Sequence, residues 1–156
     1  MLSKERINAR MQELAGRLDY DYRDISHLAA AMFCKRQEGY NNFTNDAMAT
    51  LGDTVLKLVL AEHFFDRGMD KDEITKRKIA LEKNATLKDI CDRVGVFPYA
   101  YNEQFFSGDA PVGQELPYSD HDFYLEAIVA AIYKDRGLDY VRDWILRFWR
   151  KNGYPV

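Results

Sequence analysis

The sequence predicts an all-α fold, and three observations support this class. Apolar residues recur every three to four positions along most of the 156 residues. No segment alternates apolar and polar side chains as a half-buried strand would. Only 9 glycines and 4 prolines interrupt these patterns, and 47% of the residues are apolar, enough to build a core. We expect residues 1–156 to form a single domain.

The first two predicted helices lie before residue 35. Residues 4–18 place four apolar side chains on one helical face: Ile7, Met11, Leu14 and Leu18. Residues 24–34, with the sequence DISHLAAAMFC, are mostly apolar and predict a short buried helix.

The longest predicted helix covers residues 45–66. Its inner face is expected to carry Met48, Leu51, Val55, Leu58, Val59 and Phe65. Two further helices are predicted over residues 72–83 and 86–94. Thr86 and Asp89 have the spacing of a capping box at the start of the second one, with Asp in place of Glu.

Residues 97–118 form the one long irregular stretch, and they hold three of the four prolines. This composition predicts a surface loop that could become ordered over a partner. Its aromatic side chains are interpreted as core or interface anchors rather than as base-stacking platforms: Tyr99, Tyr101, Phe105 and Phe106.

Two helices complete the chain. The first begins near Phe123, with Ser119 or Asp120 as its cap, and runs through Tyr133. The second covers residues 138–151 and is amphipathic. Its apolar face is expected to hold Val141, Trp144, Ile145, Phe148 and Trp149.

Charge and cysteine content exclude several classes of protein. Lys and Arg total 22 against 25 Asp and Glu, a net charge of −3 that excludes a polybasic arm. Cys34 and Cys91 are far apart in sequence, which argues against a disulfide framework or a thiolate zinc site. No apolar run is long enough to span a bilayer, and the first residues lack a signal-peptide core. We therefore expect a cytoplasmic protein without a membrane partner.

Two acidic residues stand in otherwise apolar helices. Glu126 lies in the middle of the helix FYLEAIVAAIYKD, and Asp53 follows Gly52 within the helix over residues 45–66. Gly in a helix interior costs about 1 kcal/mol relative to Ala. We interpret Gly52 as the point where another helix packs against the backbone. Asp46 precedes Asp53 by two turns on nearly the same face.

Such carboxylates have two interpretations. A buried, unpaired carboxylate is costly, so each acid must be neutralised, hydrogen-bonded or bound to a cation. Oxygen ligands on two packed helices would suit a hard cation such as Mg²⁺. Alternatively, each acid forms an ion pair with a basic side chain or caps a neighbouring helix.

Positive charge is concentrated between residues 71 and 93. The candidate phosphate-contacting residues are Lys76, Arg77, Lys78, Lys83 and Lys88. The alternative interpretation is a solvated helix surface with no ligand.

Three stretches carry a resemblance to a known family. NDAMATLGDTVLKLVLAEHFF resembles the signature helix of the ribonuclease III family, and ITKRKIALEKNATLKDICDRVGV resembles the segment that follows it. LEAIVAAIYKDRGLDYVRDWIL is similar to the family's last helix pair. The match is collinear from about residue 14 to residue 147, so it covers most of the chain.

The resemblance implies a helical, dimeric endonuclease domain that cuts double-stranded RNA with Mg²⁺, or with Mn²⁺ in its place. Carried over by position, Asp53 and Glu126 are the catalytic, metal-binding carboxylates. Asp46 replaces the first acid of the signature and is expected to support the metal ion indirectly or through a water molecule. The family's full-length enzymes continue into a double-stranded RNA-binding domain. This chain ends at Val156, so we expect a stand-alone nuclease domain or a part of a larger assembly.

The chain departs from the family pattern at three positions. Ala49 and Phe123 stand where the family has two further metal-site acids, and Thr50 replaces an aromatic residue that usually packs across the dimer. The Mini-III branch of the family shares the Ala-x-x-Gly-Asp pattern and also lacks the second acid. Asp122, one residue out of register, is a candidate replacement for the acid missing at Phe123.

Three functions follow from these observations. The main prediction is an Mg²⁺-dependent endoribonuclease that cleaves double-stranded or structured RNA as a homodimer. The first alternative keeps the fold but is a catalytically inactive RNA-binding or assembly subunit, which the two missing acids favour. The second is a helical protein-interaction module whose acids form internal ion pairs.

Overall fold

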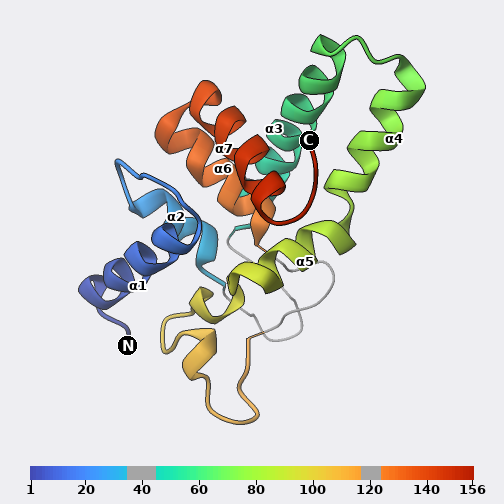
Figure 1. Cartoon of the computed structure of the whole chain (residues 1–156). Coiled ribbons are helices and arrows are strands. Elements are labelled where there is room, and N and C mark those ends of the chain that lie inside the picture. The colour runs from blue at the N-terminus through green and yellow to red at the C-terminus, as the bar shows by residue number, and fades with distance from the viewer. Residues whose placement is uncertain (35–44, 117–123) are drawn as a thin grey trace.

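The protein is described by a computed structural model over residues 1–34, 45–116 and 124–156. These residues form seven α-helices and two short 3₁₀-helices, and they contain no β-strand beyond isolated bridges of Tyr101 to Phe33 and Phe106 (Figure 1). The predicted all-α class is confirmed. The elements are α1 (Lys4–Arg17), α2 (Ser26–Met32), α3 (Asp46–Asp66), α4 (Lys71–Glu82), α5 (Asn84–Val94), η1 (Phe97–Tyr99), η2 (Ser107–Asp109), α6 (Leu125–Arg136) and α7 (Leu138–Lys151).

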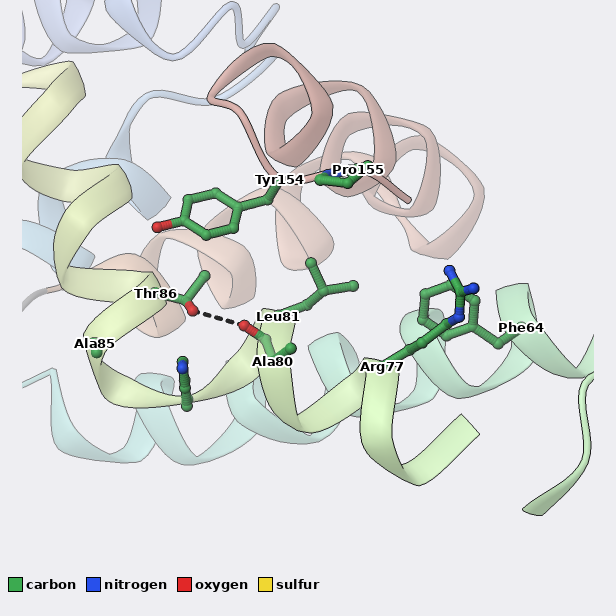
Figure 2. A pocket seen from close by; sticks show the side chains of 9 residues that line it. Phe64, Arg77, Ala80, Leu81, Ala85, Thr86, Tyr154 and Pro155 are labelled. Carbon is green, nitrogen blue, oxygen red and sulfur yellow. Dashed lines mark hydrogen bonds between the residues drawn. The ribbon is translucent and has the colours of Figure 1, made fainter. Parts of the chain in front are cut away.

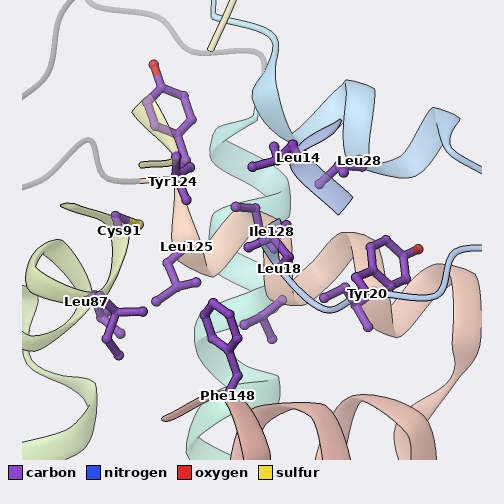
Figure 3. Close-up of a cluster of buried hydrophobic side chains, with 14 of the residues drawn as sticks. Leu14, Leu18, Tyr20, Leu28, Leu87, Cys91, Tyr124, Leu125, Ile128 and Phe148 are labelled. Atoms are coloured by element: carbon purple, nitrogen blue, oxygen red, sulfur yellow. The ribbon is translucent and has the colours of Figure 1, made fainter. Parts of the chain in front are cut away.

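Helix α6 is the central element of the core. Every residue from Ala127 to Ile132 is buried, as the apolar pattern of this helix predicts. It packs against α2, α3, α5 and α7. The side chains around Leu125 and Ile128 come from four other helices: Leu14 of α1, Leu28 of α2, Leu87 of α5 and Phe148 of α7 (Figure 3).

Buried side-chain hydrogen bonds fix the ends of the helices. The Asn45 amide donates to the carbonyl of Ala31 at 2.8 Å and so ties the start of α3 to α2. The indole of Trp144 donates to the Leu18 carbonyl at 2.8 Å, and the indole of Trp149 donates to the Leu81 carbonyl at 2.9 Å. These bonds satisfy polar atoms in the core and join α7 to the ends of α1 and α4.

The inner face of α3 differs from the prediction. Leu51, Leu58 and Phe65 are 37%, 50% and 70% exposed. The buried side chains are Val55, Leu56, Val59, Leu60 and Phe64. The helix carries two apolar stripes, and periodicity alone does not tell which of them faces the core. The exposed stripe is named here the α3 stripe and consists of Leu51, Leu58 and Phe65, which recur every seven residues.

The predicted capping box at Thr86 is wrong. Helix α5 begins at Asn84, after Lys83 adopts an extended conformation between α4 and α5. The buried Thr86 hydroxyl donates to the Ala80 carbonyl at 2.6 Å, while Asp89 accepts from Arg93 at 2.9 Å. Thr86 therefore turns back toward α4 and stabilises the bend between the two helices.

The irregular stretch after α5 is part of the core over its described residues. Tyr99, Tyr101 and Phe106 are buried, and Phe105 packs against them as a partly buried side chain. The Arg10 guanidinium of α1 lies 4.7 Å from the ring centroid of Tyr99. The interpretation of these aromatic residues as core anchors is confirmed, so their role is to hold this stretch against the domain.

The predicted caps Ser119 and Asp120 and the predicted helix start at Phe123 lie outside the described residues, as does Asp122. Within the described part of the chain, none of the helices is both long and apolar enough to cross a membrane.

Candidate active site

The candidate site forms where α3 crosses the start of α6. A Cβ atom on Gly52 would lie 1.6 Å from the Glu126 carbonyl oxygen and 3.2 Å from the Ala130 backbone nitrogen. Only glycine allows two helix backbones to approach this closely. The interpretation of Gly52 as a point of close helix packing is confirmed, and the contact brings the next residue, Asp53, beside Glu126.

Glu126 lies in the first turn of α6. The apolar pattern of the sequence instead predicts a position in the middle of a longer helix. Helix α6 begins at Leu125, because Tyr124 has a left-handed backbone conformation with φ of 69°. The free N–H groups and the dipole of a helix N-terminus favour a negative charge. This position favours the charged form of the Glu126 carboxyl, whereas burial disfavours it.

The two carboxyl groups interact directly and titrate differently. Burial, followed by the hydrogen bond and repulsion from Asp53, raises the pKa of Glu126 to about 7. Burial also acts to raise the pKa of Asp53, but hydrogen bonds from Lys57 and Glu126 outweigh it and lower that pKa. Below about pH 7 the pair therefore holds one proton, which Glu126 donates toward Asp53.

Charged side chains of α3 and α4 surround this pair, and they were not identified from the sequence. Lys57 Nζ donates to Asp53 Oδ1 at 2.6 Å and also lies 3.7 Å from Glu82 Oε1. Lys78 Nζ lies 3.3 Å from the same Glu82 oxygen. Asp53 and Lys57 are four residues apart on α3, and Lys78 and Glu82 are four apart on α4. That spacing is the signal in the sequence that indicates each pair.

Asp46 does not join the acid pair. Its side chain is exposed in the first turn of α3, two turns before Asp53. Two helical turns separate the Cα atoms by about 10 Å along the axis, which leaves room for a bridging water but not for a shared direct ligand.

Ala49 lies on the side of α3 that faces α2 and α6. It packs, partly buried, against a small cluster formed by Ala31, Ala127 and Ala131. A larger side chain at this position has to enter or leave this alanine contact. Phe123, which stands at the position of the family's other missing acid, lies outside the described residues.

The donor set at this crossing fits a single hard cation. Two carboxyl groups from two helices offer oxygen ligands, and a divalent cation would offset the burial and the repulsion from Asp53 that keep a proton on Glu126. Within residues 1–34, 45–116 and 124–156, no three Asp, Glu, His or Cys side chains converge on one point. Such a cation would be held by two protein ligands and by water.

The five predicted phosphate-contacting residues do not lie on one face. Lys76 and Arg77 line one shallow hollow on α4, and Arg77 and Lys83 line a cavity of about 450 Å³. Figure 2 shows Arg77 beside Phe64 at one end of this cavity, with Tyr154 and Pro155 above it. Lys78 turns to Glu82, and Lys88 pairs with Asp92 at 2.9 Å on α5. Of these five residues, Lys76, Arg77 and Lys83 are therefore the exposed ones.

Comparison with known proteins gives matches over most of the chain. Residues 46–137, more than half of the chain, match the model of the ribonuclease III domain. Ribonuclease 3 of Chloroflexus aurantiacus is 30% identical over 149 residues, which are 90% of this chain and 60% of that protein. Ribonuclease 3 of Symbiobacterium thermophilum is 31% identical over 134 residues, 83% of this chain and 55% of that protein. The chain thus spans somewhat more than half the length of these relatives.

The fold matches a solved structure closely. The nuclease domain of ribonuclease III from Campylobacter jejuni superposes with a TM-score of 0.72 at 24% identity, over 92% of this chain and 98% of that one. A second structure of the same domain gives a TM-score of 0.71. At this identity the likeness establishes the shared fold.

Proposed function

Since this chain belongs to the ribonuclease III family, we propose that it is an endoribonuclease that cleaves double-stranded or structured RNA with a divalent cation, Mg²⁺ or Mn²⁺. We propose further that it acts as a homodimer, and that it works in the cytoplasm, the compartment that its cysteine content favours. The observation that carries the catalytic proposal is the direct pairing of Asp53 and Glu126 at the α3–α6 crossing.

Asp53 and Glu126 would hold the cation, and Asp46 would contact it only through a bridging water. When bound, the cation lowers the pKa of a water molecule and offsets negative charge on the scissile phosphate. Glu126 has to give up its proton to become a ligand. Because burial and the hydrogen bond and repulsion from Asp53 raise the pKa of Glu126 to about 7, this proton leaves within the physiological pH range.

Three exposed basic residues support binding of the RNA backbone. Lys76 and Arg77 belong to α4, and Lys83 follows it directly. Phosphate contacts from Lys and Arg supply most of the sequence-independent affinity for nucleic acids, and the shape of double-stranded RNA allows such recognition. Lys78 is assigned to the charge network of the acid pair rather than to the RNA surface.

The α3 stripe supports the homodimer. Leu51, Leu58 and Phe65 present apolar surface along one helix, and exposed contiguous apolar surface is typical of interaction sites. The Campylobacter jejuni nuclease domain is described as having a region involved in dimer formation. A two-fold pairing of α3 with its copy would cover the stripe on both chains.

Cleavage of long double-stranded RNA tests the catalytic proposal. The purified protein is incubated with the RNA and Mg²⁺ or Mn²⁺, with EDTA as the metal-free control. We expect metal-dependent fragments from the unaltered protein and none from Asp53→Asn or Glu126→Gln, both of which should stay folded by circular dichroism. Cleavage by both variants at the rate of the unaltered protein would show that these two residues are not part of the active site.

The absence of the family's acids at Ala49 and Phe123 favours a second candidate function, an inactive RNA-binding or assembly subunit of the same fold. The same experiment separates the two. RNA binding without metal-dependent cleavage by the unaltered protein would support the inactive subunit and reject the nuclease. The third possibility, a protein-interaction module, predicts neither binding nor cleavage.

A further inference from the structure

Lys57 occupies a position between two acids of different helices. Its Nζ lies 2.6 Å from Asp53 Oδ1 on α3 and 3.7 Å from Glu82 Oε1 on α4. The Lys57 side chain is 44% exposed, so its flexible four-carbon stem is not held by packing. A movement of about one ångström in the ammonium group is enough to exchange one carboxylate for the other.

Glu82 is built to receive a positive charge. Its side chain is only 10% exposed, although it carries a carboxylate. Lys57 and Lys78 both approach Oε1, whereas no residue in the described part of the chain donates a hydrogen bond to the buried Oε2. A buried acceptor without a donor is costly, and a second close contact from an ammonium group would remove that cost.

We propose that Lys57 is a resident cation that neutralises Asp53 in the metal-free protein and moves to Glu82 when a divalent cation binds at Asp53 and Glu126. This inference rests on the proposed metal site. It assigns Lys57 and Glu82 as positioning residues, because they act on the ligand Asp53 rather than on the RNA. Glu82 provides the place to which Lys57 withdraws.

The charges around the site explain why this exchange matters. Asp53 and Glu82 together carry two negative charges, and Lys57 and Lys78 balance them. With Lys57 on Asp53, an incoming divalent cation meets an occupied ligand and a repelling charge. Withdrawal of Lys57 to Glu82 frees Asp53 without burying an unpaired charge. Lys57 thus lowers the affinity of the two-carboxylate site for the divalent cation. The site fills only when the cation concentration is high enough to displace Lys57 from Asp53.

Binding of Mn²⁺ to the RNA-free protein tests this proposal. Free Mn²⁺ gives an electron paramagnetic resonance signal that decreases on binding, so the dissociation constant is measured without cleavage. We expect Lys57→Met to bind Mn²⁺ at least fivefold more tightly than the unaltered protein. Lys57→Arg keeps the charge and should bind within twofold of the unaltered protein. Equal affinity in the unaltered protein and Lys57→Met would overturn the proposal.

Arg93→Met is the matched control. Arg93 also pairs with an acid four residues earlier, Asp89 at 2.9 Å, but on α5 rather than on α3. Its removal should leave the Mn²⁺ affinity unchanged. If Arg93→Met gained as much Mn²⁺ affinity as Lys57→Met, the loss of one positive charge from the protein would explain both gains, and the proposal would be overturned.

The role of Glu82 is tested by combining variants. Glu82→Gln should weaken Mn²⁺ binding at least fivefold in the unaltered background, because Lys57 loses its second partner. In the Lys57→Met background it should change the affinity by less than twofold. The same loss in both backgrounds would overturn the acceptor role. If Glu82→Gln does not fold, Lys78→Met replaces it. This variant removes the competing ammonium group from Glu82, so it should tighten Mn²⁺ binding more when Lys57 is present than in the Lys57→Met background, and an equal gain in both backgrounds would overturn the acceptor role.

Asp53→Asn separates failure of this inference from failure of the metal site. Loss of Mn²⁺ binding in Asp53→Asn, with no change in Lys57→Met, rejects the inference and keeps the proposed site. Equal Mn²⁺ binding by Asp53→Asn and the unaltered protein rejects the proposed site itself.

Discussion

Glu126 and Asp53 share a hydrogen bond between their carboxyl groups, and this contact joins α6 to α3 at the candidate site. Burial of Glu126, together with that hydrogen bond and the repulsion from Asp53, raises the pKa of Glu126 to about 7. Below about pH 7 the metal-free protein therefore keeps a proton on this pair that a bound divalent cation would have to displace.

The first prediction concerns stability against pH. Because the pKa of Glu126 is higher in the folded protein than in the unfolded chain, its contribution is fully present below about pH 4.5 and is lost as pH rises through 7. The free energy of unfolding of the metal-free protein should fall by up to roughly 3 kcal/mol from this group between pH 5 and 8. Urea denaturation at several pH values measures it.

Glu126→Gln should remove this pH dependence, since its amide does not titrate. Glu5→Gln is the control, because Glu5 is an exposed acid that also lies in the first turn of its helix. That variant should follow the unaltered protein at every pH. A pH profile of Glu126→Gln that parallels the unaltered protein would contradict the assignment of the raised pKa to Glu126.

The second prediction concerns the glycine at the helix crossing. Gly52→Ala would place a Cβ 1.6 Å from the Glu126 carbonyl oxygen, a backbone atom that cannot rotate away. We expect a loss of about 3 kcal/mol or more in the free energy of unfolding, measured by urea denaturation.

Gly16→Ala is its matched control. Gly16 also lies inside a helix, but a Cβ there would meet no atom within 4 Å. This variant should be up to about 1 kcal/mol more stable than the unaltered protein, because alanine favours helix. Similar effects of the two substitutions would show that helix propensity, not packing, explains Gly52.

The helical period of the apolar residues predicted the fold class, and the candidate acids were visible against that apolar pattern. An acid or a glycine inside an apolar helix is costly, so Gly52, Asp53 and Glu126 stand out from their surroundings. The resemblance to ribonuclease III is confirmed by the family model over residues 46–137. The roles of Asp53 and Glu126 in metal binding and catalysis stay predictions.

Lys57 and Glu82 could not be predicted in the same way. A lysine four residues after an aspartate is an ordinary feature of an exposed helix face, and nothing in the pattern of α4 says which of its faces meets α3. The error at Leu58 and Phe65 has a related cause. A stripe that would be buried against another chain has the same apolar spacing as one buried in the core. Tertiary contacts decide both questions.

The third prediction concerns the α3 stripe. Leu58→Glu should convert a homodimer into a monomer, because it places a charge in the middle of the proposed interface. Light scattering or sedimentation should give a mass near 18.2 kDa for this variant and about twice that for the unaltered protein. Ile79→Glu alters another exposed apolar residue, on α4, and should stay dimeric. A monomeric unaltered protein at all concentrations would contradict the proposed homodimer.

The fourth prediction concerns the exposed basic residues. Lys76→Ala and Arg77→Ala should each weaken RNA binding and reduce the slope of log affinity against log salt by about one when a phosphate contact is lost. Fluorescence anisotropy with double-stranded RNA in EDTA measures binding without cleavage. Lys88→Ala should have a smaller effect, because Lys88 pairs with Asp92 in the free protein. A salt slope unchanged in all three variants would place the RNA on another face.

The last prediction concerns the acid that is missing at Ala49. Ala49 precedes Asp53 by one helical turn and packs against the alanine cluster of Ala31, Ala127 and Ala131. In Ala49→Glu the new carboxylate would lie at the family position of a metal-site acid, at a packing cost of about 1–3 kcal/mol. If the site is a working nuclease centre, the variant should reach half-maximal cleavage at a lower Mg²⁺ concentration than the unaltered protein. Ala47→Glu is the control, because Ala47 is exposed in the same turn of α3 and adds the same charge. A folded Ala49→Glu protein with an unchanged or higher Mg²⁺ requirement would contradict the claim that Ala49 faces a working metal site.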